Sequence, residues 1–213
     1  GKGRGALMLE NTTEDMVPTN TLPISEITPN KDQPRKTFDE AALDELAESI
    51  KQHGVLQPLL VRPLPNGGYQ LVAGERRWRA SRRAGLREVP VVVKELTDTE
   101  TMEIAIIENL QREDLNPIEE AEGLQALIDK CGFTQEEVAS SVGKSRPAIA
   151  NSLRLLRLPE KVRELTRDGK ISAGHARALI SLDNDALIIE AAENVIKNKL
   201  TVRDVERLAK TRD

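Results

Sequence analysis

The stretch YQLVAGERRWRA, residues 69–80, contains an apolar run, a glycine and then an arginine-rich segment. Its first five residues are typical of a β-strand, and the residues from Glu75 onward are typical of a helix. A strand that passes through Gly74 into a helix start brings free backbone N–H groups and the positive end of a helix dipole together. Arg76 and Arg77 add donors that suit phosphate oxygens. The stretch therefore predicts an anion site on an α/β fold.

Glu75 is unusual because it is a carboxylate among arginines. A carboxylate near phosphates can orient a water molecule or a metal ion, which makes Glu75 a candidate catalytic residue. The alternative is an amphipathic helix that buries Trp78 and leaves its arginines in solvent. The stretch alone supports both interpretations equally.

The residues around this stretch predict a small α/β domain over residues 21–96. Thr37 and Glu40 form a capping-box pattern ahead of an apolar helix face, and Gly54 suits the end of that helix. The turn Pro-Asn-Gly-Gly at 65–68 separates two short β-branched or aromatic runs. The other expected elements are strands at 22–27, 59–61, 69–73 and 90–93, and a helix from 75 to about 84.

From residue 97 onward the pattern becomes helical. Capping boxes recur at Thr97–Glu100 and Thr134–Glu137, and Asn116 before a proline suits another helix start. The fold class that we expect is α+β, with a small α/β domain followed by an all-α domain. The first expected helix begins at the Thr97 box and ends at about residue 111. The others are expected from 117 to a stop at Gly132, as two short helices on either side of Gly143, from 159 to about 169, and over 172–182, 185–199 and 201–210.

Composition excludes several classes of protein. The chain has 213 residues, of which 38% are hydrophobic and only 2% aromatic, so its cores rest on aliphatic side chains and favour helices. Cys131 is the only cysteine, which excludes a disulfide framework and a cysteine zinc site and leaves it as a small core residue. No stretch approaches the roughly 20 apolar residues of a membrane-spanning helix, and the first residues lack the apolar core of a secretory signal. We expect a cytoplasmic protein without a membrane partner.

Charge is segregated along the chain although the net charge is only −4. Residues 62–94 carry 8 basic and 2 acidic side chains, residues 95–130 carry 2 and 11, and residues 131–182 carry 9 and 5. Two basic blocks on either side of an acidic block suggest separate anion-binding surfaces. Solvated helix faces are the alternative, but they do not easily explain so many arginines in the first block.

The acidic block contains ENLQRED, residues 108–114, at a predicted helix end. Glu108 and Asn109 supply hard oxygen ligands of the kind that Mg²⁺ accepts beside phosphate oxygens. An ordinary acidic helix terminus is the favoured interpretation when this motif stands alone. Two further segments, QPRK at 33–36 and GVLQP at 54–58, place polar groups on restricted loops and are weak signals alone.

Residues 134–156 fit a helix-turn-helix. Gly143 suits the turn, Ser145 suits the N-cap of the second helix, and Lys144 is a candidate phosphate contact. Arg146 is a candidate for a guanine edge in the major groove. The predicted buried face consists of Val138, Ala139, Val142, Ile149, Leu153 and Leu156, and the predicted DNA face of the second helix consists of Ser145, Arg146, Ala148, Asn151 and Arg154.

An ordinary αα-hairpin is the alternative for this segment, but its basic block and its small polar face favour DNA. The later segment GHAR, residues 174–177, opens another predicted helix. Gly174, His175 and Arg177 are candidates for additional DNA contacts through backbone N–H groups and the guanidinium. A packed or capping role is the more frequent one for a lone histidine such as His175.

Five segments occur in an order that resembles the ParB family of chromosome-partitioning proteins, over about residues 21–210. Each motif is weak alone, and the five together are highly specific. The segments are QPRK at 33–36, GVLQP at 54–58, GERRWRA at 74–80, ENLQREDLNP at 108–117 and GKSRPAIANSLRLLRLP at 143–159.

The resemblance implies a nucleotide site and a DNA site. It implies that the N-terminal domain binds CTP (or CDP) with Mg²⁺ and that Glu75 supports slow CTP hydrolysis. It implies that the helix-turn-helix domain binds centromere-like parS DNA and that parS stimulates the hydrolysis. The implied nucleotide-site residues are Gly74, Arg76 and Arg77 for the triphosphate, Gln33, Arg35, Gln57 and Pro58 around the pocket, and Glu108 and Asn109 for Mg²⁺.

The resemblance also implies a sliding clamp. Two chains form a homodimer whose N-terminal domains close on CTP, the clamp spreads on DNA from parS, and hydrolysis reopens it, with 115–117 as a hinge. The N-terminal GKGRGALM resembles the basic arm that stimulates a ParA-type ATPase, and an SMC condensin is a further implied partner. The implied location is the nucleoid in the cytoplasm.

The expected domain limits are a flexible arm at 1–20, a CTP-binding domain at 21–115 and a parS-binding domain at 116–213. ParB chains continue into a C-terminal dimerisation domain, which we expect to be missing here because the sequence stops at Asp213. Ala148 is a departure, since relatives often carry a larger polar residue there.

Two other hypotheses remain. The first is a ParB-like DNA-binding adaptor without nucleotide turnover, which the motifs at 74–77 and 108–112 disfavour. The second is an enzyme on the same N-terminal fold, such as a sulfiredoxin-like protein or a nucleotide-dependent kinase. Sulfiredoxin chemistry needs a reactive thiol at the phosphate site, and Cys131 lies between predicted helices outside it.

Overall fold

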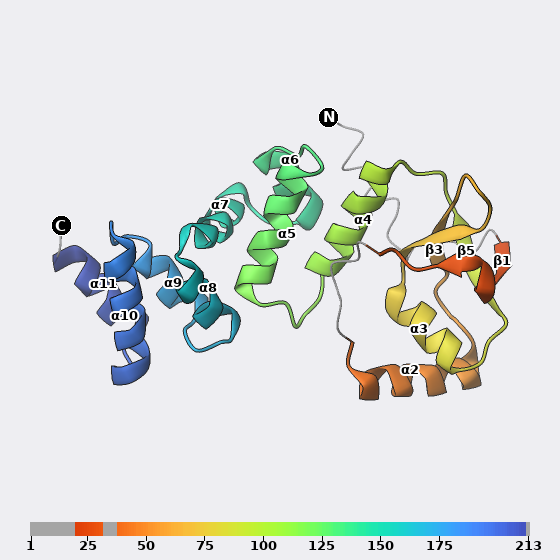
Figure 1. Ribbon diagram of the computed structural model, residues 1–213, viewed down its shortest axis with the longest axis horizontal. Helices are drawn as coiled ribbons and strands as arrows, with labels where there is room; N and C mark the ends of the chain where they lie inside the picture. Colours follow the sequence, from red (N-terminus) through yellow and green to blue (C-terminus); the bar gives the residue numbers. More distant parts are fainter. Residues whose placement is uncertain (1–19, 32–37, 212–213) are drawn as a thin grey trace. The chain divides into compact units, whose positions relative to one another are not determined.

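The computed structural model describes residues 20–31 and 38–211 (Figure 1). The chain divides into two compact units, Gly1–Asn109 and Leu110–Asp213. The first unit carries a β-sheet with helices, and the second is helical, so the predicted α+β class is confirmed. The segment GKGRGALM and the predicted arm lie outside the described residues, except for Asn20, which begins the first strand.

The first unit contains a mixed sheet of five strands in the order β1-β5-β3-β4-β2. The central strand β3 pairs with β4 in antiparallel and with β5 in parallel orientation, while β1 and β2 form the two edges. The elements are β1 (Asn20–Pro23), the 3-10 turn η1 (Ile24–Glu26), β2 (Ile27–Thr28), α2 (Glu40–His53), β3 (Leu59–Pro63), β4 (Tyr69–Ala73), α3 (Glu75–Arg83), β5 (Glu88–Val93) and α4 (Asp98–Leu110).

The predicted single strand at 22–27 is wrong. Pro23 ends β1, and the Ile24 N–H donates to the Arg87 carbonyl at 2.8 Å. The Ile27 N–H then donates to the Ile24 carbonyl, which forms the 3-10 turn. The chain then leaves one sheet edge and joins β4 at the other as β2. Alternation of apolar and polar residues cannot show this break, because both short strands keep the same pattern.

The core of the first unit combines the sheet with α3. The β3 side chains Leu59, Leu60 and Val61 are fully buried, and Trp78 of α3 shares an apolar cluster with Leu59 and Val61. The helix α2 packs against α3. Its N-cap is Asp39, whose carboxylate accepts from Ala41 N at 3.0 Å, so the helix starts later than a cap at Thr37 predicts.

The second unit is a set of short helices with well-formed caps. The predicted box at Thr134 and Glu137 is present there, and the one at Thr97 and Glu100 is present in the first unit, at the start of α4. The elements are α5 (Pro117–Asp129), α6 (Gln135–Val142), α7 (Arg146–Arg154), the 3-10 turn η2 (Leu155–Arg157), α8 (Glu160–Arg167), α9 (Ala173–Leu179), α10 (Asp185–Asn198) and α11 (Val202–Thr211).

The core of this unit is aliphatic, as the low aromatic content predicts. Ile118, Leu155 and Leu179 are among its fully buried members. Of the predicted buried face, Val142, Leu153 and Leu156 are only half-buried. Leu155 takes the inward position in place of Leu156, where the chain tightens into η2. Cys131 is buried, as predicted.

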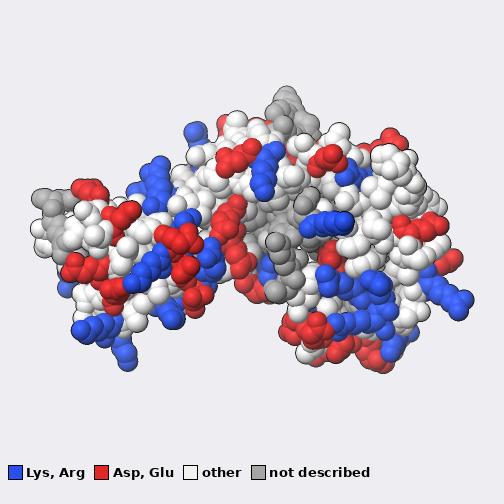
Figure 2. Space-filling model, viewed as in Figure 1, with Lys and Arg blue, Asp and Glu red and all other residues white. Residues whose placement is uncertain are grey.

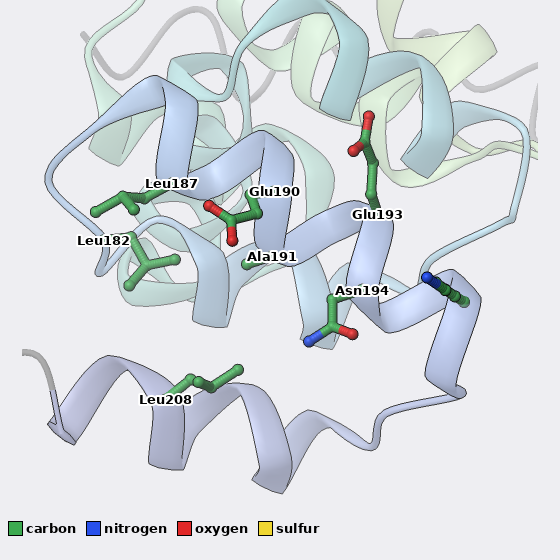
Figure 3. A pocket seen from close by; sticks show the side chains of 8 residues that line it. Leu182, Leu187, Glu190, Ala191, Glu193, Asn194 and Leu208 are labelled. Atoms are coloured by element: carbon green, nitrogen blue, oxygen red, sulfur yellow. The ribbon is translucent and has the colours of Figure 1, made fainter.

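A pocket of about 370 Å³ lies between α10 and α11 (Figure 3). Leucine side chains and four polar or charged ones surround it, and Glu193 at its rim is paired with Lys161. Its lining residues are Leu182, Leu187, Glu190, Ala191, Glu193, Asn194, Lys197 and Leu208. In the described ranges, no helix is both long enough and apolar enough to cross a membrane.

Candidate functional site

The junction between β4 and α3 is centred on Gly74. This residue has φ 103° and ψ 31°, in the left-handed region, and it is the N-cap of α3 without a side-chain cap. A Cβ here would lie 2.8 Å from Leu59 Cδ2, so only glycine fits between the strand and the helix. The first-turn N–H groups of α3 therefore stay without a side-chain cap, as the predicted anion site requires.

Arg77 connects this junction to the loop before β3. Its Nη1 donates to the carbonyls of Gln57 at 3.0 Å and Pro58 at 2.8 Å. Burial lowers the pKa of Arg77, and the charge of Glu108 acts in the opposite direction. The predicted site residues Gln57, Pro58 and Arg77 thus lie together, although they are separated in sequence.

Glu108 at the end of α4 joins the same cluster. Its Oε1 accepts from the Gly74 N–H at 3.3 Å. Desolvation raises the pKa of Glu108, the neighbouring Glu75 raises it further, and the Gly74 N–H and Arg77 lower it. Glu108 is nevertheless exposed, and a carboxylate that lies near a second carboxylate gains from a nearby cation, which fits a metal ligand.

Asn109 follows Glu108 at the end of the helix and is half-buried. Among the described residues, no three His, Cys, Asp or Glu side chains gather closely enough to hold a metal ion alone. The oxygens of Glu108 and Asn109 fit Mg²⁺ only as part of a set completed by water or phosphate oxygens.

Glu75 is buried in this conformation. Its Oε1 accepts from Arg79 Nε at 3.1 Å, and its Oε2 is buried without a partner among the described residues. Arg79 also lies over the Phe38 ring at 4.2 Å. Arg76 is exposed, in agreement with a ligand-facing role, whereas Gln33 and Arg35 lie outside the described residues.

Basic side chains gather on one face of the first unit where α3 lies, next to acidic ones (Figure 2). Part of this charge is neutralised within the unit, because Arg83 bonds Glu40 and Asp44 of α2. The packed interpretation is confirmed for Trp78, and the anion site stays a prediction. Trp78 is in the core, and Arg77 extends to the Gln57 and Pro58 carbonyls.

The segment 134–156 has helix-turn-helix geometry. Gly143 ends α6 with φ 71°, and the Lys144 N–H donates back to the Ala139 carbonyl at 3.0 Å. Ser145 caps α7 by accepting from the Ala148 N–H at 3.2 Å. The predicted DNA-facing side chains Arg146, Ala148, Asn151 and Arg154 are all exposed along α7.

Lys144 has a partner that sequence reasoning missed. Its Nζ bonds Glu120 of α5, which is 24 residues away in sequence. Two residues later on α5, Glu122 bonds Arg167 of α8 at 2.8 Å. Neither pair has a local sequence signal, because each depends on how the helices pack.

His175 performs a structural role at the start of α9. Its Nδ1 accepts from the Ser172 backbone N–H at 3.2 Å and lies 2.8 Å from the Ser172 hydroxyl, while its Nε2 bonds the Leu200 carbonyl at 2.8 Å. Gly174 allows α11 to approach, since a Cβ there would meet Val202 Cγ2 at 3.0 Å. Arg177 is exposed and leaves the guanidinium available for an external anion.

Comparison with known proteins agrees with this architecture. The family model of the ParB N-terminal domain matches residues 8–110, and the model of the ParB HTH domain matches residues 113–213. The fold and the sites thus define a two-domain protein with a ParB-type α/β domain and a helix-turn-helix domain. The chain belongs to the ParB family.

Relatives in this family are named for chromosome partitioning. The chain is 53% identical to the chromosome-partitioning protein Spo0J of Thermus thermophilus, over 98% of this chain and 76% of that protein. It is 54% identical to the chromosome-partitioning protein ParB of Myxococcus xanthus, over 88% of this chain but only 63% of that protein. The chain therefore spans about two-thirds to three-quarters of the length of these relatives.

A solved relative has a similar fold. The C-terminally truncated chromosome-partitioning protein ParB from Caulobacter crescentus, in complex with the centromeric parS site, matches with a TM-score of 0.79 and 46% identity. The match covers 91% of this chain and all of that one.

The position of His175 generates a test. We expect His175→Ala to lower the free energy of unfolding of the second unit by about 1 kcal/mol, because it removes half of a capping box and the bond to Leu200. Arg177→Ala on the same helix is the matched control and should leave stability unchanged, since Arg177 is exposed. Thermal and urea unfolding measure both variants. Equal stability of the two would contradict the structural role of His175.

Proposed function

We propose that this chain is the nucleotide- and DNA-binding part of a chromosome-partitioning ParB that works as a CTP-dependent clamp on parS DNA. The observation that carries the proposal is the cluster around Gly74. The Gly74 N–H bonds Glu108, and Arg77 bonds the Gln57 and Pro58 carbonyls, so three separate motifs meet in one unit. Ordinary packing of an arginine-rich helix does not require this convergence.

In the proposed nucleotide site, the N-terminus of α3 with Arg76 and Arg77 holds the triphosphate of CTP, and the loop at 54–58 lies beside the nucleotide. Glu108 and Asn109 hold Mg²⁺, which neutralises phosphate charge when it is bound. The position of Glu108 supports this assignment, because its side chain is exposed and its carboxylate lies at the Gly74 N–H, where a cation that arrives with the phosphates can reach it.

In the proposed DNA site, α7 enters the major groove of parS. Arg146, Asn151 and Arg154 face the DNA, with Ser145 and Ala148 at the start of the helix, and Lys144 and Arg177 contact phosphates. The Caulobacter relative was solved on the parS site, which supports the same ligand for this chain. His175 and Gly174 position the helix that carries Arg177.

The clamp itself is the finer part of the proposal. Two chains associate as a homodimer, CTP closes their N-terminal domains, the clamp leaves parS and spreads, and slow parS-stimulated hydrolysis reopens it. The segment at 115–117 follows α4 and includes the first residue of α5, and it is the proposed hinge. A ParA-type ATPase at the N-terminal segment and an SMC condensin are the proposed partners on the nucleoid.

One observation favours the alternative of a DNA-binding adaptor without turnover. Glu75, the proposed residue for hydrolysis, is buried, and one of its carboxylate oxygens is already bonded to Arg79. Hydrolysis through Glu75 therefore needs this pair to open when the nucleotide binds.

Glu108→Gln tests the nucleotide site. We expect it to abolish Mg²⁺-dependent CTP binding in calorimetry while Glu113→Gln, an exposed change in the same motif, preserves binding. The pKa of Glu108 is higher in the folded chain than in the unfolded chain, so folding disfavours its ionised form. As the pH rises from the ordinary carboxyl range through the raised pKa, ionisation of Glu108 therefore lowers the free energy of unfolding. Glu108→Gln should therefore not lower the unfolding temperature at neutral pH. Intact Mg²⁺-dependent binding in this variant would show that the metal assignment is wrong.

Arg146→Ala tests the DNA site. We expect its affinity for a parS duplex to fall by about 1–3 kcal/mol and its affinity for random duplex to fall much less, because a base-edge contact carries sequence information. Fluorescence anisotropy at fixed salt measures both. An equal loss on the two duplexes would make Arg146 a phosphate contact.

A further inference from the structure

Lys144 stands at the entrance of the recognition helix α7 and is already bound to an anion. Its Nζ pairs with Glu120 Oε1, and the lysine side chain is 47% exposed while that of Glu120 is 27% exposed. The lysine backbone is fixed by the turn, since its N–H bonds the Ala139 carbonyl. The ion pair thus joins the turn of the helix-turn-helix motif to α5.

The other proposed DNA-contacting cations differ from Lys144. In the part of the chain that the structure describes, Arg146, Arg154 and Arg177 make no ion pair, and all three are exposed. A DNA phosphate can approach these guanidinium groups without displacing a protein anion. At Lys144 it must compete with a carboxylate.

Glu120 is the better fixed member of the pair. It lies in the first turn of α5, where the helix dipole favours a negative charge, and it is more buried than its partner. The lysine has a long flexible stem and only its backbone is anchored. When the pair opens, the ammonium group therefore moves and the carboxylate stays.

We propose that Glu120 is an internal competitor of the DNA phosphate for Lys144, and so a positioning residue that weakens the sequence-independent part of DNA binding. In the free protein, Glu120 neutralises one positive charge beside the N-terminus of α7. On DNA, Lys144 leaves Glu120 and contacts a phosphate. The free energy needed to break the Lys144–Glu120 pair is subtracted from the binding free energy of that phosphate contact. The inference rests on the proposed DNA-binding function and adds a residue that does not touch DNA.

Glu120→Gln tests the inference. We expect affinity for a random duplex and for a parS duplex to rise by a similar factor, on the order of two- to five-fold at low salt, because an exposed ion pair of this kind no longer has to open. The gain should shrink as salt rises, since salt screens the competing charge. Anisotropy titrations over a salt series measure both affinities.

Glu122→Gln provides the matched control. It removes the same charge from the same helix two residues away, but its partner is Arg167, which is not among the proposed DNA contacts. It should change DNA affinity much less. In the background of Lys144→Ala, Glu120→Gln should have no effect, because the competed group is absent.

The outcomes separate the possible explanations. An equal gain in Glu120→Gln and Glu122→Gln would reduce the effect to net charge and overturn the inference. An unchanged or lower affinity in Glu120→Gln, or a gain that persists with Lys144→Ala, would also overturn it. If the unaltered chain binds neither duplex, the proposed DNA function fails first, and the inference fails with it. Thermal unfolding of Glu120→Gln within about 2 °C of the unaltered chain shows that the affinity change is not a folding defect.

Discussion

The first unit depends on one steric constraint, the space between β4 and α3 at Gly74. A left-handed residue is needed there to turn the strand into the helix, and a side chain would collide with Leu59 of β3. The same turn aims Arg77 at the loop before β3 and leaves the Gly74 N–H directed to Glu108. The glycine therefore sets the fold and the proposed phosphate site together, and neither can be changed alone.

The second unit achieves its geometry through caps instead of a sheet. Side chains at Asn116, Thr134, Ser145 and Ser172 satisfy the first N–H groups of four helices, and an aliphatic core holds the helices together. Most charges around the turn of the helix-turn-helix are on exposed side chains. The two ion pairs from α5, at Lys144 and Arg167, connect that turn and α8 to the same helix. Packing thus decides which cations are available to an external anion.

Local signals in the sequence predict much of this structure. The capping boxes at Thr97 and Thr134, the Asn-Pro helix start and the strand–glycine–helix junction are all present, because each depends on neighbouring residues only. Features that depend on distant residues could not be found in this way. The Glu120–Lys144 and His175–Leu200 bonds span 24 and 25 residues, and the separation of β1 from β2 requires knowledge of both sheet edges. The resemblance to ParB supplied the proposed site residues, which no local pattern connects.

The central claim is that the cluster around Gly74 and the helix-turn-helix belong to one CTP switch. Phosphate release from CTP and from ATP, each with a parS duplex and without it, tests this claim most directly. The account predicts that phosphate is released from CTP but not from ATP, and that the parS duplex clearly stimulates this release. Equal release from both nucleotides, or release from CTP that parS does not change, would contradict it. Absence of CTP binding would leave a DNA-binding adaptor in which the residues around Gly74 only pack a helix against a sheet.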